Sequence, residues 1–582
     1  MKMMMHFLKQ YKKECVLAPL FKMLEALLEL FVPLVVARII DQGIYAQDKT
    51  YIITRCLILF VLAAAGLAFS VTAQYFAAKS AVGAATAMRG KLFRHIQTFG
   101  YEEMDAAGSA TLITRMTSDI NQVQSGINMA LRLFLRSPFV VLGAVVMAFS
   151  IDIEAALIFA VTVPLLAVVV FTVMAVTKPI YKKVQGSLDR ILNITRENLS
   201  GVRVIRAFHQ EQNEIDSFCA VNDELTGLQK FAGKISGLSN PLTFVIINVA
   251  IILLVYVGAL RVDMGELSQG EVVALYNYMS QILVELVKFA NLIVTITKAL
   301  ASMNRIGDVL HITPNMKEGQ GSGLRIIQGE GSEQGDEPPI IEFQDVSFGY
   351  HANGEPAIQH ISFRVKRGET VGIIGGTGAG KSTLINLIPR FYDVTKGTVR
   401  IRGRNIKEYT FQELRSQISV VPQKAQLFAG TIRSNLMLGC PDATEEDLEE
   451  ALEISQAAEF VNTKEKGLDF VVEQGGKNLS GGQKQRLTLA RALVRKSEIL
   501  IMDDSASALD YATDAKLRKA IREMKGKPTV FIVSQRASSI LNADQIIVLD
   551  DGEMAGIGTH EELLTSCKVY QEIYETQFMK EN

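Results

Sequence analysis

Apolar residues are concentrated in the first half of the chain, in six long stretches. A helix needs about 20 mostly apolar residues to cross a bilayer, so the pattern predicts six transmembrane helices. They cover residues 16–40, 56–78, 137–151, 155–177, 241–260 and 272–298. The third is short. The sixth contains Glu285 and Lys288, and we expect that part to face protein or water because charges are costly in lipid.

The polar segments between these stretches alternate in length and charge. Segments 79–136 and 178–240 are long and rich in lysine and arginine, whereas the other connections are short and not basic. The positive-inside rule therefore places both long segments and both chain ends in the cytoplasm. Their apolar periodicity is helical, as in residues 188–205. We expect the transmembrane helices to continue as helices beyond the bilayer.

The second half of the chain has a different pattern. Residues 313–339 are rich in glycine, glutamate, serine and proline, which is typical of a linker. From residue 340, short β-branched runs alternate with amphipathic segments, which predicts an α/β domain with a largely parallel sheet. The runs are 370–374, 418–421, 499–502, 529–533 and 545–549. The expected organisation is a helical membrane domain at 1–312, a linker, and an α/β domain at 340–582.

Composition narrows the function classes. The chain has 582 residues, a net charge of −1 and a positive mean hydropathy, which excludes a small secreted protein, a disordered chain and a fibre. A balanced charge argues against a protein that binds nucleic acid. The five cysteines contain no C-x-x-C pair, so a disulfide framework or a cysteine-based metal centre is not expected.

A glycine-rich loop follows the expected strand at 370–374. Residues 375–382 read GGTGAGKS and fit G-x-x-x-x-G-K-[ST]. In such a loop the backbone N–H groups surround phosphate oxygens, Lys381 reaches the β- and γ-phosphates, and Ser382 coordinates Mg²⁺. Asp503 ends a second apolar run, where a carboxylate can hold the same Mg²⁺. The sequence therefore predicts an ATP and Mg²⁺ site.

The segment 479–483 reads LSGGQ. With the phosphate loop and Asp503, it makes the chain resemble the ABC transporters, in particular exporter half-transporters that fuse one six-span domain to one P-loop ATPase domain. The resemblance covers nearly the whole chain. It implies ATP-driven export, with Tyr350 stacking on adenine and Gln423 touching Mg²⁺. The implied ligands of Mg²⁺ are Ser382, Gln423 and Asp503. The implied ATP-binding residues are Tyr350, Gly375, Gly376, Thr377, Gly378, Ala379, Gly380, Lys381, Ser382, Thr383, Gln423 and Asp503, and in trans Leu479, Ser480, Gly481, Gly482, Gln483 and Asp510.

The resemblance also implies that one chain cannot complete an ATP site. In the family, the signature of one subunit binds the γ-phosphate held by the other, so a second half-transporter is expected as partner. Two segments, 99–105 and 201–218, resemble the coupling regions through which membrane domains dock onto ATPase domains. The 507–510 segment is similar to the family's dimer-interface segment.

Two residues depart from the family pattern at the catalytic position. Asp504 stands where the family usually has the glutamate that activates water, and Gln535 stands where it usually has histidine. A shorter carboxylate sits back by roughly 1.5 Å, and glutamine cannot carry a proton or a positive charge. A third, softer change is Gln474, ahead of the signature. Altered catalytic residues beside an intact signature are similar to the hydrolysis-impaired subunit of a heterodimeric bacterial multidrug exporter, whose partner carries glutamate and histidine at the matching positions.

Other functions remain open on the sequence alone. A homodimer in which Asp504 still works slowly is one alternative, and a lipid or peptide exporter is another. An ATP-dependent clamp on chromosomes shares the signature but is excluded by six membrane spans, and a channel or regulator gated by ATP fits only in part. The expected location is the cytoplasmic membrane of a bacterium.

The sequence gives little information about the substrate. What it gives comes from charged residues within the first span. Lys22, Glu25 and Glu29 fall on one helix face. Lys22 is placed to snorkel or to pair with Glu25 at i+3. Glu29 either pairs with a basic residue of another span, such as Lys288, or lines the translocation pathway together with Glu25. The second alternative favours cationic amphipathic substrates.

Overall fold

The computed structural model describes residues 2–321, 338–350, 354–505 and 509–578. Its contacts divide the chain into two compact units. The first is Met1–Thr98 with Ala107–Ile312, and the second is Phe99–Ala106 with Thr313–Asn582. The division after Ile312 falls where the linker was expected to begin, and residues 322–337 of that linker lie outside the described residues. Residues 99–106, which the sequence placed in the membrane domain, belong by their contacts to the second unit.

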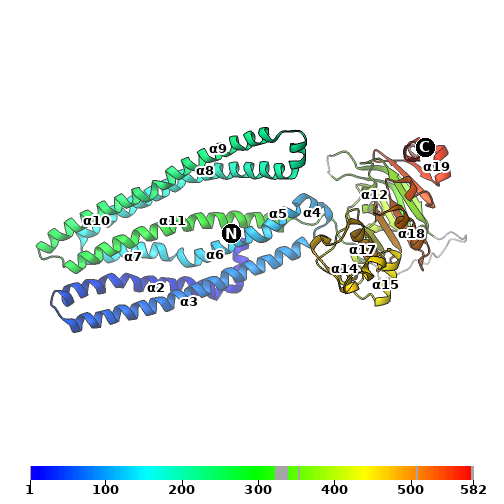
Figure 1. The fold of residues 1–582 in the computed structure, drawn as a ribbon. Helices are drawn as coiled ribbons and strands as arrows, with labels where there is room; N and C mark the ends of the chain where they lie inside the picture. Colours follow the sequence, from blue (N-terminus) through cyan, green and yellow to red (C-terminus); the bar gives the residue numbers. More distant parts are fainter. Residues whose placement is uncertain (1, 322–337, 351–353, 506–508, 579–582) are drawn as a thin grey trace. The chain divides into compact units, whose positions relative to one another are not determined.

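The first unit is helical (Figure 1). Its helices are α1 (Lys2–Leu8), α2 (Lys12–Arg38), α3 (Lys49–Ile96), α5 (Ser109–Thr114), α6 (Ile120–Leu133), α7 (Arg136–Ile151), α8 (Ile153–Ala207), α9 (Glu211–Gly237), α10 (Ser239–Asp263) and α11 (Gln269–His311), with shorter turns at Lys9–Tyr11, Ile39–Ile44 and Arg115–Asp119. The starts of the three longest helices are capped by side chains, since Asp48, Asp152 and Ser268 accept hydrogen bonds from backbone N–H groups in the first turns of α3, α8 and α11.

Five helical runs in the described part of the chain are long and apolar enough to cross a membrane. They are Lys49–Ile96, Ser109–Ile151, Ile153–Ala207, Glu211–Asp263 and Gln269–His311. The expected short third span is thus the end of a run of 43 residues. The first expected span corresponds to α2, a helix of 27 residues that packs along α3. α2 is long enough but is not among the five runs, because the charged residues Lys22, Glu25 and Glu29 lie near its middle.

The helices extend well beyond the thickness of a bilayer, as the sequence predicted. At 1.5 Å per residue, the 55 residues of α8 span about 80 Å, against a hydrocarbon core of about 30 Å. Small residues such as Ala144, Ala156 and Ala274 are buried where α2, α7, α8, α10 and α11 pack together, which allows close approach of the helices.

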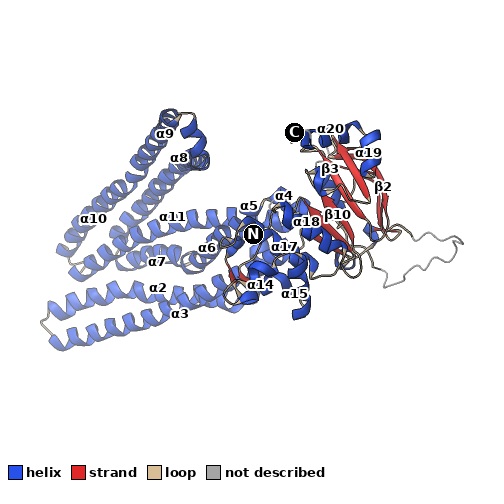
Figure 2. Cartoon of the chain, turned by 45° about the vertical axis from the view of Figure 1, so that its right-hand side comes forward, coloured by secondary structure: helices blue, strands red, loops and turns tan. Residues whose placement is uncertain are grey.

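The second unit is an α/β domain with two main sheets (Figure 2). A six-stranded sheet has the order β12-β11-β3-β10-β9-β6, in which only β12 is antiparallel to its neighbour. An antiparallel sheet has the order β2-β1-β4-β5, and β7 pairs with β8. The strands are β1 (Ile341–Phe348), β2 (Ile358–Val365), β3 (Thr370–Gly375), β4 (Lys396–Ile401), β5 (Arg404–Asn405), β6 (Ile418–Val421), β7 (Gly430–Thr431), β8 (Val471–Val472), β9 (Ile499–Asp503), β10 (Thr529–Val533), β11 (Gln545–Asp550) and β12 (Glu553–Gly558).

The helices of this unit are α4 (Tyr101–Ala107), α12 (Lys381–Leu387), α13 (Phe411–Ser416), α14 (Ile432–Met437), α15 (Glu445–Ile454), α16 (Ala458–Asn462), α17 (Gly481–Leu493), α18 (Tyr511–Arg522), α19 (His560–Ser566) and α20 (Lys568–Phe578). Of these helices, α12, α13, α17 and α20 contact the parallel strands. All five strands expected from the sequence are present, each within one residue of its expected end. The antiparallel sheet was not anticipated.

Alternate residues of the parallel strands enter different cores, as the period of a strand requires. Ile499 and Ile501 of β9 pack in one cluster with Leu384 of α12, whereas Leu500 and Met502 pack in another with Leu487 of α17. The carboxyl ends of β3, β9 and β10 lie at one edge of the sheet, and this edge carries the predicted site.

Candidate functional site

The loop that joins β3 to α12 is built so that only glycine fits at two of its positions. A Cβ at Gly375 would lie 2.1 Å from the carbonyl oxygen of Leu549, and a Cβ at Gly380 would lie 2.5 Å from Ile358. Gly380 also has φ +89°, in the left-handed region that L-residues disfavour. Residues 375–380 therefore form a tight turn that leads into α12, with residues 376–378 exposed to solvent.

Lys381 and Ser382 open α12 beside this loop. The ammonium of Lys381 donates hydrogen bonds to the carbonyl oxygens of Gly375 at 2.8 Å and Gly376 at 2.5 Å. Burial lowers the pKa of Lys381, while the nearby Asp504 and Asp503 oppose that shift. A buried cation in a loop of this type is suited to bind phosphate oxygens.

Asp503 and Ser382 provide oxygen ligands at the same place. The hydroxyl of Ser382 donates to a carboxylate oxygen of Asp503 at 3.0 Å, and burial raises the pKa of Asp503. Among the described residues, no group of three Asp, Glu, His or Cys side chains is placed to hold a metal ion alone. A hydroxyl and one carboxylate fit Mg²⁺, which is usually bound by few protein ligands together with phosphates and water. Gln423 lies exposed in the loop after β6.

Tyr350 is placed beside the phosphate loop. Its hydroxyl and that of Thr383 are 3.0 Å apart. Phe348 and Tyr392 contact its ring edge-on, and 43% of the residue remains exposed. An aromatic ring fixed at its edges and open to solvent is suited to stack on a base.

The two residues that depart from the family pattern meet at the same sheet edge. In the register of β10, Val533 pairs with both Asp503 and Ile373. The N–H of Asp504 donates to the carbonyl oxygen of Val533 at 3.0 Å, and Gln535 follows two residues after Val533. Asp504 has φ +43°, a conformation that aspartate tolerates better than most residues.

Gln577 is a residue of this region that the sequence did not reveal. Its side-chain amide donates to the carbonyl oxygen of Gln535 at 2.8 Å and accepts from the N–H of Ala537 at 2.8 Å. The sequence does contain a pattern that points to Gln577. Tyr570, Ile573 and Tyr574 are spaced so that they share one helix face with position 577. A polar residue that continues an otherwise packed face is a candidate for a specific contact.

The signature segment lies in another part of the domain. Leu479 is only 6% exposed and packs with Leu487 in the core cluster of α14, α15 and α17. Ser480 caps α17, since its hydroxyl accepts from the N–H of Gln483 at 3.3 Å and the Gln483 side chain accepts from the N–H of Ser480 at 3.1 Å. Gly481 is exposed, with no atom near its Cβ position. The signature is thus preformed at a helix start and packs with a different core cluster from α12.

Asp510 has a structural role in the described chain. Its carboxylate caps α18 by accepting from the N–H and hydroxyl of Thr513, and the backbone hydrogen bond lowers the pKa of Asp510. Residues 506–508, which include Ser507 of the expected interface segment, lie outside the described residues.

The structure therefore brings one group of predicted residues together and leaves another apart. Tyr350, Asp503 and the loop 375–383 form one site, with Asp504 and Gln535 at its edge. The signature does not join them within one chain among the described contacts.

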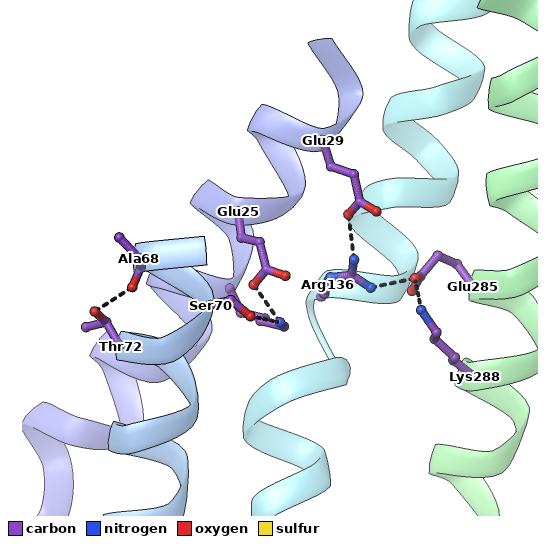
Figure 3. A network of polar contacts seen from close by, with 9 residues as sticks. Glu25, Glu29, Ala68, Ser70, Thr72, Arg136, Glu285 and Lys288 are labelled. Carbon is purple, nitrogen blue, oxygen red and sulfur yellow. Dashed lines mark hydrogen bonds and ion pairs between the residues drawn. The ribbon is translucent and has the colours of Figure 1, made fainter. Parts of the chain in front are cut away.

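The membrane domain holds a network of ion pairs (Figure 3). Arg136, whose side chain is 7% exposed, contacts Glu29 at 2.6 Å and Glu285 at 2.5 Å. Lys288 contacts Glu285 at 2.9 Å, and the hydroxyl of Ser137 donates to Glu285 at 2.8 Å. Glu29 is therefore paired with Arg136 and not with Lys288, which the sequence had offered as an example.

Glu25 lies in a second, smaller group one turn away from Glu29 on α2. Lys22 contacts Glu25 at 2.5 Å, as the i, i+3 spacing allowed, and also donates to Ser70 of α3 at 3.1 Å. Snorkelling of Lys22 is not observed, since its side chain is buried.

A cleft of about 420 Å³ borders the larger network. Its walls combine apolar side chains of α2 and α7 with polar side chains of α11. The lining includes Glu29, Val36, Val140, Gln281, Glu285 and Lys288. The Oε1 atom of Gln281 is buried with no hydrogen-bond partner among the described residues. This amphipathic cleft was not foreseen from the sequence.

Comparisons with known proteins agree with these features. Residues 15–286 match the family described as ABC transporter transmembrane region, and residues 358–507 match the family described as ABC transporter. The chain is 35% identical over 575 residues to an uncharacterized ABC transporter ATP-binding protein, YfiB, of Bacillus subtilis, covering 99% of this chain and 98% of that protein. It is 27% identical over 573 residues to an ATP-dependent lipid A-core flippase of Vibrio vulnificus, covering 98% and 96%.

A solved structure shares the fold. The structure of a bacterial Atm1-family ABC exporter with ATP bound aligns with a TM-score of 0.78, covering 97% of this chain and 98% of that one, at 22% sequence identity.

Proposed function

Because the chain belongs to the ABC transporters, as an exporter-type half-transporter with an ATP-hydrolysing domain, we propose that it exports amphipathic small molecules as one half of a heterodimer. In this proposal its own site binds ATP but hydrolyses it slowly, and its signature completes the hydrolysing site of the partner. The location is the cytoplasmic membrane of a bacterium, with the ATPase domain and both termini in the cytoplasm.

The observation that carries this proposal is that Asp504 and Gln535 both lie at one edge of a site whose phosphate loop and Asp503 match the family pattern. The loop, Lys381, Ser382 and Asp503 have the geometry for binding. The two residues that act on the attacking water in the family are both replaced. A general base must reach its proton at about 2.6–3.2 Å, which a carboxylate shortened by one methylene is expected to miss. We therefore expect ATP binding to be preserved and ATP hydrolysis at this site to be slow.

In this proposal, different residues of the chain bind the phosphates, the base and the Mg²⁺ ion of ATP. The backbone of 375–380 and Lys381 bind the phosphates, and Tyr350 stacks on the base. Ser382, Asp503 and Gln423 hold Mg²⁺, which when bound neutralises phosphate charge. Ser480 and Gly482 contact the γ-phosphate of the partner's ATP from a helix start, where backbone N–H groups favour anions.

Two surface features support a second subunit. The ATPase domain has a cleft of about 560 Å³ next to Gln423 in the sequence. Its lining includes the exposed side chains of Phe428 and Leu438, together with Lys424, Arg491 and Arg495. At the turn between α8 and α9, Phe208 is 71% exposed and acidic residues follow it at 211 and 214. A partner built in the same way would place Phe208 against the apolar side chains of this cleft, with Glu211 and Glu214 near its basic residues.

The pairing has a direct test. Purified alone, the chain is expected to show little substrate-stimulated ATP turnover, because each of its sites would carry Asp504 and Gln535. Purified with a half-transporter that has glutamate and histidine at the matching positions, it is expected to show strong stimulation. ATPase assays on both preparations make the comparison. A homodimer whose stimulated turnover equals that of the mixed complex would refute the heterodimer and favour a homodimeric exporter.

The membrane cleft supports an amphipathic substrate, and Glu29 gives it a preference for cations. One oxygen of Glu29 accepts from Arg136, yet 42% of the side chain remains exposed. The apolar walls suit a hydrophobic body, while the exposed part of the Glu29 carboxylate suits a positively charged or hydrogen-bond-donating head. Glu25 takes part less directly, because it is paired with Lys22.

Glu29→Gln is expected to reduce transport of cationic dyes about tenfold, the value of one charge-assisted hydrogen bond. Transport of neutral substrates and the amount of assembled complex should remain unchanged. Dye efflux from vesicles measures both classes of substrate. The matched control is Lys288→Met, which removes a cation from the same cleft and should not reduce transport of cations. Poor assembly, or an equal decline for all substrates, would make Glu29 a structural residue.

A second candidate function is lipid translocation, favoured by the likeness to a lipid A-core flippase. Under that function, the Glu29→Gln complex moves a fluorescent anionic lipid as well as the unmodified complex does. A lipid with a cationic head would distinguish a charge preference from a lipid preference.

A further inference from the structure

The last helix of the ATPase domain packs against the loop that follows β10. Tyr570 at its start is fully buried, and its hydroxyl lies 2.8 Å from Nδ1 of His560. Ile573 and Tyr574 continue the same face. This face packs against Ala537, which is also fully buried, and against Ile374 next to the phosphate loop. The helix therefore forms a wall behind the nucleotide site.

Gln577 extends this face and contacts the backbone of the loop from two sides. Its amide nitrogen donates to the carbonyl oxygen of Gln535, and its amide oxygen accepts from the N–H of Ala537, both at 2.8 Å. A single side chain thus fixes the peptide groups on both sides of residue 536. An amide side chain offers both a donor and an acceptor without carrying a charge.

Other contacts hold the rest of the loop but not the Gln535 carbonyl. Ser534 donates its N–H to Ile373 of β3 at 3.1 Å. The guanidinium of Arg536 lies over the ring of Tyr511, and Arg518 donates to the carbonyl of Ser538 at 2.9 Å. Among the described residues, Gln577 is the only one whose side chain donates a hydrogen bond to the backbone carbonyl of Gln535.

We propose that Gln577 is a positioning residue that sets the backbone of Gln535, and so controls how long this subunit retains ATP. The inference rests on the proposed function insofar as Gln535 faces the γ-phosphate. A loop held in place keeps the Gln535 side chain within reach of the phosphate and slows release of the nucleotide. α20 thereby acts on a site that it does not touch.

The test measures nucleotide release from this subunit in the assembled complex. A radiolabelled, non-hydrolysable ATP analogue with a photoreactive base is bound and then chased with unlabelled ATP. Cross-linking at intervals gives the label that remains on this chain, which is separated from its partner by size. Three variants are compared: Gln577→Leu, Gln577→Glu and Gln571→Leu. Gln571 is the matched control, because it lies on α20 and donates to the carbonyl of Leu564.

The expected result is release about three- to tenfold faster in Gln577→Leu, the range for losing one hydrogen bond. Gln577→Glu should also release faster, because a carboxylate can accept from Ala537 but cannot donate to Gln535. Gln571→Leu should match the unmodified complex, and all three should unfold at unchanged temperature. Release at the unmodified rate in Gln577→Leu or Gln577→Glu overturns the proposal. Equal acceleration in Gln571→Leu also overturns it, since that shows general loosening of α20.

Failure of the proposed function would appear separately. If the unmodified chain hydrolyses ATP at its own site as fast as the partner does, the assignment of an impaired site is wrong. The ratio of release rates with the non-hydrolysable analogue still reports on Gln577.

Discussion

Ser480→Ala is expected to remove most of the ATP turnover of the assembled transporter, by about tenfold or more. The Ser480 hydroxyl caps α17 and, in the proposed complex, also donates to the γ-phosphate of the partner's ATP. A hydrogen bond to a charged group is worth about 1.5–3 kcal/mol, and a serine cap about 1 kcal/mol. Lys381→Ala, by contrast, weakens ATP binding at this chain's own loop and should leave part of the turnover. Steady-state ATPase assays of the two single variants reveal the asymmetry.

The control for the capping role is Thr444→Ala. Thr444 caps α15 through the same reciprocal pattern with Asp447, away from the nucleotide, so its loss should leave turnover near normal. A further variant, Asp504→Glu alone, should raise ATP hydrolysis at this chain's own site only slightly, because Gln535 remains. Equal losses from Ser480→Ala and Thr444→Ala would reduce Ser480 to a structural cap. Equal losses from Ser480→Ala and Lys381→Ala would mean that the two ATP sites are equivalent.

Arg136→Met is expected to destabilise the membrane domain by about 3 kcal/mol. Removing one partner of a buried ion pair typically costs about 3–5 kcal/mol, because the other charge stays buried and unpaired. The lower value applies here, since Lys288 and Ser137 still contact Glu285. Size-exclusion chromatography of the detergent-extracted complex after heating measures the loss as a lower midpoint temperature.

Two further variants make the Arg136 result specific. Arg132→Met, in the last turn of α6, removes an arginine that forms no ion pair among the described residues, and it should change the midpoint little. Replacing Arg136 and Glu285 together by apolar residues should recover much of the stability, because no buried charge is left without a partner. An unchanged midpoint in Arg136→Met would show that water enters the network freely.

The sequence predicted the elements of the ATPase domain well, because each strand is a short apolar run bounded by a turn. The phosphate loop and Asp503 followed directly, since both are local patterns at strand ends. The antiparallel sheet was missed. Its strands mix buried and exposed positions with bulges between β1 and its neighbours, which weakens the alternating pattern.

The membrane domain shows why local patterns fail between helices. The Lys22–Glu25 pair was accessible from its i, i+3 spacing on one helix. The partner of Glu29 depends on how α2, α7 and α11 are rotated against one another, and no spacing within the chain encodes that rotation. Arg136 was assigned to the end of a cytoplasmic segment because it precedes an apolar run. In the structure it is the first residue of α7 and lies buried between two carboxylates.

The ATPase unit is discontinuous in sequence, because residues 99–106 belong to it by contact. Tyr101 stacks on Phe391 with ring centroids 4.4 Å apart, and the hydroxyl of Tyr392 donates to Asp105 at 2.8 Å. A fragment that begins at residue 340 therefore lacks part of its own packing and exposes aromatic surface in its place. The chain crosses between the two units three times, so the ATPase unit is not an exchangeable module at the end of a membrane protein. Swapping it between related transporters requires the short segment at 99–106 to be exchanged with it.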